Sequence, residues 1–327
     1  MRAACGHHHC PVSGKNGRQQ PLTMRNLAPL PVATSTNNVS RRGIVWLASY
    51  PKSGNTWFRI FLRYLLDEPD EDEDLSAMTT GISSHRDLFD TCTGLDSSNL
   101  TAEEIDGLRP RVYEQVAGNC RTQPVFLKAH DAFTYLPNGE PLLSRQATAG
   151  AIYFLRNPLD VAVSYAYHSG HDDFAKVILN MASRERALQK STDGLDSQLR
   201  QQLLDWSGHV RSWLDQTDIP VHVLRYEDML AKPLETFRGA VQFAGLEYDD
   251  SQIVAALDQC RFERLQEKER ERGFRERLPK AKVFFREGRA GSWRDKLTDD
   301  LVTRVLSDHG EVMRRFHYLN ERGELLA

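Results

Sequence analysis

Apolar residues in this chain form short uninterrupted runs, and longer stretches with helical periodicity separate them. The runs lie at residues 44–48, 124–127, 151–155 and 220–224. Each run is long enough for a buried strand. Short buried strands that alternate with helices are typical of a parallel sheet covered on both faces. The pattern therefore predicts an α/β fold with a central parallel sheet flanked by helices.

The helical stretches carry apolar residues at intervals of three and four. Three sets show this spacing: Trp57, Ile60, Phe61, Tyr64 and Leu65; Leu199, Leu203, Trp206, Val210, Trp213 and Leu214; and Leu301, Val302, Val305 and Leu306. In the first set Arg59 and Arg63 fall on another face of the helix. Thr101 and Glu104 have the spacing of a capping box, which predicts that a further helix begins there.

Composition divides the chain into a leader and one domain. Residues 1–40 are rich in Gly, Pro, Ser, Asn and Gln, so we expect a disordered leader followed by a domain over 41–327. The leader leaves open whether translation starts at Met1 or Met24. Its Cys-Gly-His-His-His-Cys cluster at 5–10 lacks the separated ligand pairs of a structural zinc site, and a solvated tail is the simpler interpretation.

Charge and cysteine content narrow the partners and the compartment. The formal net charge of −3 argues against nucleic acid as a partner, because such binding needs a cationic surface. No apolar run approaches the 18 residues that span a bilayer, so we expect no membrane partner. Five scattered cysteines without CxxC spacing suit the reducing cytoplasm.

Two stretches are dense in charge. Residues 67–74 are acidic and read as a solvated loop. Residues 261–277 mix both signs, which favours an exposed helix or, as the alternative, a mobile lid over a ligand.

Polar residues follow each predicted strand at its carboxyl end, where open parallel sheets bind ligands. These segments are Ser49–Thr56, Lys128–His130, Arg156–Pro158 and Arg225–Asp228. Because the carboxyl ends of parallel strands meet at one edge of a sheet, the four segments predict an active site.

The first segment has the features of a phosphate-binding loop. It joins a strand to a helix through a turn with Pro51 and Gly54, Lys52 adds a positive charge, and Ser53 and Thr56 add hydroxyl donors. The lysine precedes the glycine, unlike the G-x-x-x-x-G-K-[ST] order of nucleoside triphosphatases, and no clear acidic strand end offers a magnesium ligand. The loop therefore predicts a P-loop-like nucleotide site without an obligatory metal.

Five motifs, in order, resemble those of the cytosolic-type sulfotransferases, which use 3′-phosphoadenosine-5′-phosphosulfate (PAPS). They are Tyr50–Trp57 (YPKSGNTW, where the family usually reads YPKSGTTW), Lys128-Ala-His130, Arg156–Ser164, Tyr226–Met229 (YEDM) and Phe285–Trp293 (R-x-G-x-x-G-x-W). The resemblance extends from about residue 44 to 298.

The resemblance implies roles for individual residues. Lys52 neutralises the leaving 5′-phosphate, Lys128 stabilises the sulfuryl oxygens, and His130 takes the proton of the acceptor hydroxyl. The residues expected to bind the nucleotide are Lys52, Ser53, Gly54, Asn55, Thr56, Trp57, Arg156, Ser164, Tyr226, Phe262, Arg286 and Gly288. Of these, Arg156, Ser164, Arg286 and the Gly288 amide hold the 3′-phosphate, and Trp57 and Phe262 enclose the adenine.

Each assignment has a structural alternative. Trp57 and Phe262 could belong to the core, Arg156 could form a surface salt bridge, and His130 could be a satisfied structural histidine. His168 and His171 are expected near the acceptor without a catalytic role.

The sequence also departs from the family pattern. Asn55 replaces a common threonine, and Glu287 stands where many relatives have a basic residue. We expect Arg286 and Arg289 to offset its charge, either by pairing with Glu287 or by reaching the phosphate, and Arg289 to replace the missing basic residue in part. The family's dimer motif is poorly kept, with Thr298 followed by Asp299, and leaves open a monomer or a homodimer.

The expected function is transfer of a sulfuryl group from PAPS to a hydroxyl or amine of a small molecule, which releases adenosine 3′,5′-bisphosphate (PAP). The alternatives are a nucleotide or small-molecule kinase of related fold and a non-catalytic PAP-binding protein. The walls of the acceptor pocket are expected from residues 75–95 and 165–176, whose mixed composition does not identify the acceptor.

Overall fold

The computed structural model describes residues 42–67, 74–76, 78–119, 124–189 and 196–326. The predicted leader and most of the acidic stretch at 67–74 lie outside these ranges. None of the helices within them combines the length and the apolar character needed to cross a membrane.

A five-stranded sheet forms the centre of the fold, with strand order β2-β3-β1-β4-β7. The strands are β1 (Ile44–Ser49), β2 (Gly81–Ile82), β3 (Val125–Ala129), β4 (Thr148–Leu155) and β7 (Val221–Arg225). Every pairing in the sheet is parallel, and β1 lies between β3 and β4. The four predicted strands and the parallel sheet are therefore confirmed.

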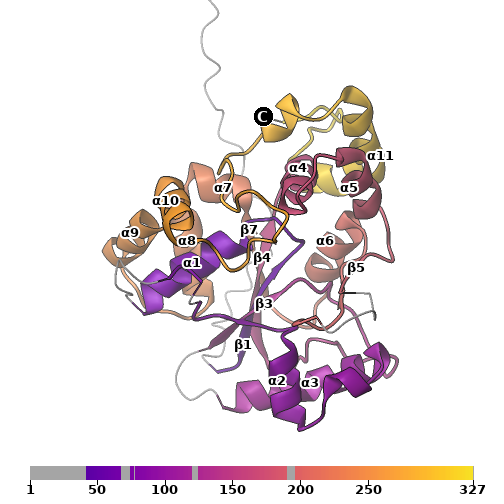
Figure 1. The fold of residues 1–327 in the computed structure, drawn as a ribbon, viewed down its shortest axis with the longest axis vertical. Helices are drawn as coiled ribbons and strands as arrows, with labels where there is room; N and C mark the ends of the chain where they lie inside the picture. Colours follow the sequence, from indigo (N-terminus) through magenta and orange to yellow (C-terminus); the bar gives the residue numbers. More distant parts are fainter. Residues whose placement is uncertain (1–41, 68–73, 77, 120–123, 190–195, 327) are drawn as a thin grey trace, which may run out of the picture. The chain divides into compact units, whose positions relative to one another are not determined.

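Helices cover both faces of this sheet (Figure 1). One face carries α1 (Asn55–Leu66), α8 (Pro233–Phe243), α9 (Asp250–Gln259) and α10 (Phe262–Arg272). The other carries α3 (Ala102–Gly118), α4 (Pro158–His168), α6 (Trp206–Leu214) and α11 (Asp299–Arg315). The remaining elements are α2 (Arg86–Thr93), η1 (Ser97–Asn99), α5 (Phe174–Met181), β5 (Ala187–Leu188), β6 (Gln201–Gln202), α7 (Tyr226–Ala231) and η2 (Ser292–Asp295).

The alternation of side chains along β1 explains the two layers of core. Ile44, Trp46 and Ala48 belong to one apolar cluster, whereas Val45 and Leu47 belong to the other. Successive strand residues point to opposite faces, so a strand that is apolar throughout requires cover on both sides.

The predicted start of α3 is confirmed. Thr101 caps α3 by accepting from the Glu104 amide at 3.2 Å, and the Glu104 carboxylate accepts from the Thr101 amide at 2.8 Å, which confirms the capping box.

The prediction that Leu199 and Leu203 share a helix with Trp206 was wrong. The Asp205 carboxylate accepts from the Gly208 amide at 2.6 Å and starts α6 at Trp206, so the two leucines are buried in the segment before the helix.

Candidate active site

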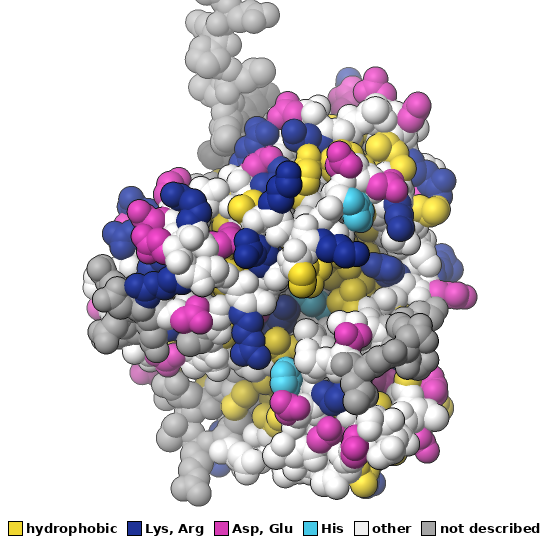
Figure 2. Space-filling model, viewed as in Figure 1, with side chains coloured by type: hydrophobic (Ala, Val, Ile, Leu, Met, Phe, Trp, Pro, Cys, Tyr) yellow, Lys and Arg dark blue, Asp and Glu magenta, His cyan; other side chains and the backbone are white. Residues whose placement is uncertain are grey.

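A cavity of about 1070 Å³ opens at the carboxyl ends of the strands. Lys52, His130, Arg156 and Tyr226 line it, one from the segment after each predicted strand. In Figure 2, dark blue Lys and Arg side chains border a hollow on this face, with yellow and cyan side chains inside it. Every predicted site residue lines the cavity except Ser53, which is buried and has no hydrogen-bond partner for its Oγ in the described part of the chain.

The loop before α1 has an unusual backbone. Lys52 and Gly54 both have positive φ, 73° and 103°, and the helix begins directly after, at Asn55. A Cβ on Gly54 would lie 2.8 Å from the Tyr226 ring, so no larger residue fits without a shift. The Asn55 side chain donates to the Leu47 carbonyl at 2.7 Å and thereby ties the loop to β1.

Lys52 is half-buried among other cations. Burial, together with Lys128, Arg156 and Arg286, lowers the pKa of its ammonium to about 7, although the Glu276 carboxylate acts against this. Its Nζ lies 4.2 Å from the centre of the Phe284 ring. Because these surroundings disfavour the charged form of Lys52, an anionic ligand beside it would stabilise the ammonium.

Arg156 is 8% exposed and belongs to no ion pair among the described residues, so it is not a surface salt bridge. Its Nη1 donates to the Lys52 carbonyl at 3.0 Å and its Nη2 to the Arg289 carbonyl at 3.3 Å, while Nε is buried without a partner. The guanidinium lies 4.1 Å from the centre of the Tyr226 ring. These contacts hold the cation in place without neutralising it.

His130 has a defined tautomer. Its Nδ1 lies 2.8 Å from the Ser49 carbonyl, which can only accept, so Nδ1 carries the proton and a neutral ring has its lone pair on Nε2. Burial and the nearby Lys128 hold the pKa of this imidazole well below its usual value. His130 is therefore a neutral side chain with a free basic nitrogen on a residue that lines the cavity.

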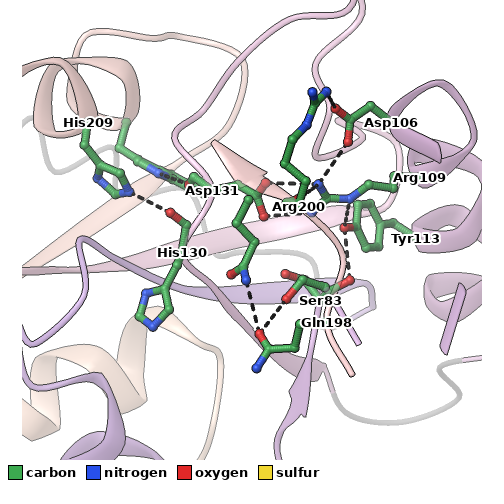
Figure 3. Close-up of polar contacts among 12 residues, drawn as sticks. Ser83, Asp106, Arg109, Tyr113, His130, Asp131, Gln198, Arg200 and His209 are labelled. Atoms are coloured by element: carbon green, nitrogen blue, oxygen red, sulfur yellow. Dashed lines mark hydrogen bonds and ion pairs between the residues drawn. The ribbon is translucent and has the colours of Figure 1, made fainter. Parts of the chain in front are cut away.

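A buried polar network supports the segment around His130 (Figure 3). Arg109 of α3 donates two hydrogen bonds, at 3.0 and 2.7 Å, to the carboxylate of Asp131, the residue that follows His130. His209 of α6 approaches the His130 carbonyl at 3.1 Å through Nε2. The His130 ring points away from this network. The sequence analysis missed Arg109 and Asp131, because an arginine in a polar helix and an aspartate after a strand show no local sign of pairing.

The negative charge of Glu287 is balanced by arginines of the same loop. The Glu287 carboxylate contacts Arg286, and Arg289 Nε lies 3.2 Å from it, so both arginines offset its charge as expected. A Cβ on Gly288 would lie 2.4 Å from the Phe262 ring, which places this loop directly against Phe262. Trp57 donates from Nε1 to the Cys260 carbonyl at 3.1 Å. Trp57 and Phe262 both line the cavity.

Glu276 is a cavity residue that sequence reasoning missed. Its carboxylate accepts from Thr56 Oγ1 at 3.3 Å, lies 3.4 Å from Lys128 Nζ and pairs with Arg59. Burial opposes its charge, but Lys128 and Arg59 hold its pKa far below the usual range. Glu276 belongs to the mixed-charge stretch 261–277, whose first part forms α10 as expected. Nothing in the local sequence distinguishes it from its exposed neighbours.

The segments expected to form the acceptor pocket contribute residues to the cavity lining, and two further segments do so as well. Residues from 75–95 and 165–176 line the cavity, including His168 but not His171. Burial and the nearby Lys52 lower the pKa of His168 to about 3. Residues of the segments 186–189 and 197–201, which the sequence did not indicate, also line the cavity.

The comparisons with known proteins all indicate the same protein family. The family model described as the sulfotransferase domain matches residues 43–317. A flavonol 3-sulfotransferase of Flaveria bidentis is 23% identical over 274 residues, which cover 80% of this chain and 78% of that protein. A luciferin sulfotransferase of Photinus pyralis is 26% identical over 276 residues, which cover 78% of this chain and 68% of that protein.

Solved structures share the fold. A retinol dehydratase in complex with androsterone and the inactive cofactor PAP is 20% identical with a TM-score of 0.56, and the match covers 85% of this chain and 82% of the other. A mouse sulfotransferase complexed with PAP is 17% identical with a TM-score of 0.52, and the match covers 87% and 88%.

Proposed function

The chain belongs to the sulfotransferase family, and we propose that it transfers the sulfuryl group of PAPS to a small-molecule hydroxyl with His130 as the general base. The observation that carries this assignment is the convergence of a neutral His130 and the unpaired cations Lys52 and Arg156 on one cavity. A base for the acceptor and positive charge for the leaving group are the two needs of this reaction.

The residues present fit PAPS. Burial and neighbouring cations lower the Lys52 pKa to about 7, and Arg156 keeps a buried Nε without a partner. These two cations, at one end of the cavity, form no ion pair among the described residues. Ser164 and Arg286 line the same end, where they are proposed to hold the 3′-phosphate together with Arg156. Trp57 and Phe262 are proposed to enclose the adenine.

The proposed chemistry assigns one step to each group. His130 accepts the hydroxyl proton at Nε2 while its Nδ1 hydrogen bond to Ser49 stabilises the imidazolium that forms. Lys52 donates to the developing charge on the leaving phosphate. When bound, PAPS supplies the sulfuryl group: its sulfur–phosphate oxygen bond breaks, a sulfur–acceptor oxygen bond forms, and PAP leaves with the electron pair.

The Ser49 carbonyl, rather than a carboxylate, orients the His130 ring, so the ring is well suited to change between its neutral and charged forms. We propose amines as acceptors alongside hydroxyls. The cytoplasm remains the proposed compartment, which Cys92 and Cys260, both free thiols, support.

Calorimetry with PAP and AMP tests the nucleotide assignment. If buried cations hold the 3′-phosphate, PAP should bind about a hundredfold more tightly than AMP. Equal affinities would remove the 3′-phosphate site. Transfer of label from PAPS to acceptors then tests the reaction, and activity that requires ATP and magnesium would favour the kinase alternative.

A further inference from the structure

Arg186 lies directly before β5. It lines the same cavity as His130, and its Nη2 donates to the Tyr165 hydroxyl at 3.3 Å. Its guanidinium carbon lies 5.9 Å from the centre of the Tyr165 ring. This ring contact and hydrogen bond fix the direction of the side chain.

The charge of Arg186 is not neutralised within the described part of the chain. No ion pair among those residues includes it, and its Nε is buried without a hydrogen-bond partner. The nearby Asp205 is engaged elsewhere: it accepts from the Gly208 amide at 2.6 Å and lies 3.6 Å from Arg184 Nε. Asp205 does not line the main cavity. A half-buried guanidinium of this kind favours an anionic ligand.

A series of contacts also connects Arg186 with the segment around His130. Tyr165 directly follows the cavity residue Ser164 on α4. Tyr50, at the start of the Lys52 loop, has a buried hydroxyl without a partner, and its electrostatic environment includes both Tyr165 and Arg186. The Tyr50 ring packs edge-on against His209, which contacts the His130 carbonyl. These contacts link the guanidinium to the segment that carries the base. Neither Arg186 nor Tyr165 is among the residues proposed to hold the nucleotide, although Tyr165 follows one of them, Ser164.

The other charged groups of the cavity do not compete for this position. Its two carboxylates are paired, Glu276 with Arg59 and Lys128, and Glu287 with Arg286 and Arg289. The cavity lining also includes neutral polar side chains, among them Ser197, Gln198 and Gln201.

We propose that the acceptor is an organic anion: a hydroxyl compound with a carboxylate that pairs with Arg186 while its hydroxyl faces His130. This proposal rests on the proposed sulfotransferase activity and adds the substrate class. Arg186 acts as a specificity-determining residue, because the guanidinium binds the carboxylate and takes no part in the proton or sulfuryl transfer.

Matched acceptors test this assignment in the full chain with saturating PAPS. The first pair is 4-hydroxyphenylacetate and 4-hydroxyphenylacetamide, in which a methylene group insulates the phenol from the group that changes. The second pair is 4-(hydroxymethyl)phenylacetate and its amide. We expect kcat/KM to be about tenfold to a hundredfold higher for the carboxylate of a pair, as for one charge-assisted contact.

Variants locate the effect. Arg186→Gln should lower kcat/KM for the carboxylate by about tenfold to a hundredfold, lower that for the amide far less, and leave PAP affinity unchanged. Arg145→Gln is the control, since this arginine is exposed and does not line the main cavity. Arg186→Lys should restore part of the preference. Calorimetry of 4-hydroxyphenylacetate with the PAP complex gives a readout independent of turnover.

Several results would overturn the inference. These are equal or better use of the amides, a loss of the same size for both members of a pair in Arg186→Gln, the same change in Arg145→Gln, and no turnover of either pair by a protein that binds PAP. A protein that binds neither PAP nor PAPS would instead refute the proposed function itself.

Discussion

Two groups of cations share the active-site cavity, and they differ in how their charge is balanced. Arg59 and Lys128 both lie against the carboxylate of Glu276. Lys52 and Arg156 belong to no ion pair among the residues that the structure describes. The first group contains its own anion, whereas the second group lacks one.

This difference indicates where the nucleotide anion belongs. Buried cations without a counter-charge are costly, so a fold that retains them gains most when a ligand supplies the charge. Glu276, in contrast, already occupies the donors Thr56 and Lys128 that are expected to serve the phosphosulfate. Either this carboxylate withdraws when PAPS binds, or it stays and orients Lys128.

The largest expected effect comes from the unbalanced group. Lys52→Ala should lower turnover by about a thousandfold and also weaken PAP, because the same ammonium meets the bound phosphate and the leaving group. Steady-state kinetics and PAP calorimetry measure both. Lys176→Ala, at an exposed lysine of α5, is the control. A variant that kept normal turnover would show that the missing negative charge is not supplied at Lys52.

His130→Ala should affect chemistry without affecting the nucleotide. Loss of the base should lower turnover by about a hundredfold or more, while PAP affinity remains close to that of the unchanged protein. The control is His171→Ala, which changes a histidine outside the cavity lining. Wild-type turnover in His130→Ala would leave the histidine with a structural role only.

Glu276→Gln decides between the two possibilities for the balanced group. If the carboxylate withdraws, its removal should tighten PAP by about tenfold, because a buried like charge no longer opposes the phosphate. If it stays to orient Lys128, PAP affinity should be unchanged and turnover should fall. Glu263→Gln, at an exposed position of α10, is the control, and thermal unfolding reports the lost ion pair with Arg59.

The pH dependence of PAP binding should show the smallest effect. The free protein has a Lys52 pKa of about 7, set by burial and by Lys128, Arg156 and Arg286 against Glu276, and a bound phosphate should raise it. Binding above pH 7 then takes up a proton, so affinity should fall as pH rises, by about fivefold between pH 7 and 8. Calorimetry in buffers of different ionisation enthalpy measures the proton uptake. Lys52→Met should lose this slope, and an unchanged slope would assign it to another group.

The sequence determined the sheet and the phosphate-binding loop, because both depend on local patterns. Four apolar runs predicted the main strands, and the order of Lys52 and Gly54 before a helical stretch predicted the loop. The prediction of a helix that begins at Leu199 was wrong, because buried apolar residues can recur at helical spacing in a segment that is not a helix. The Asp205 cap sets the start of α6 at Trp206.

Only the tertiary structure decided the electrostatics of the site. Arg59 was assigned to the polar face of a helix, yet it is buried and paired with Glu276, 217 residues away in the sequence. The neutral tautomer of His130 depends on the Ser49 carbonyl, and the free charge of Arg186 depends on Asp205 being engaged elsewhere. Charge balance and hydrogen-bond partners arise from contacts between distant segments, and residue types in a local window do not record these contacts.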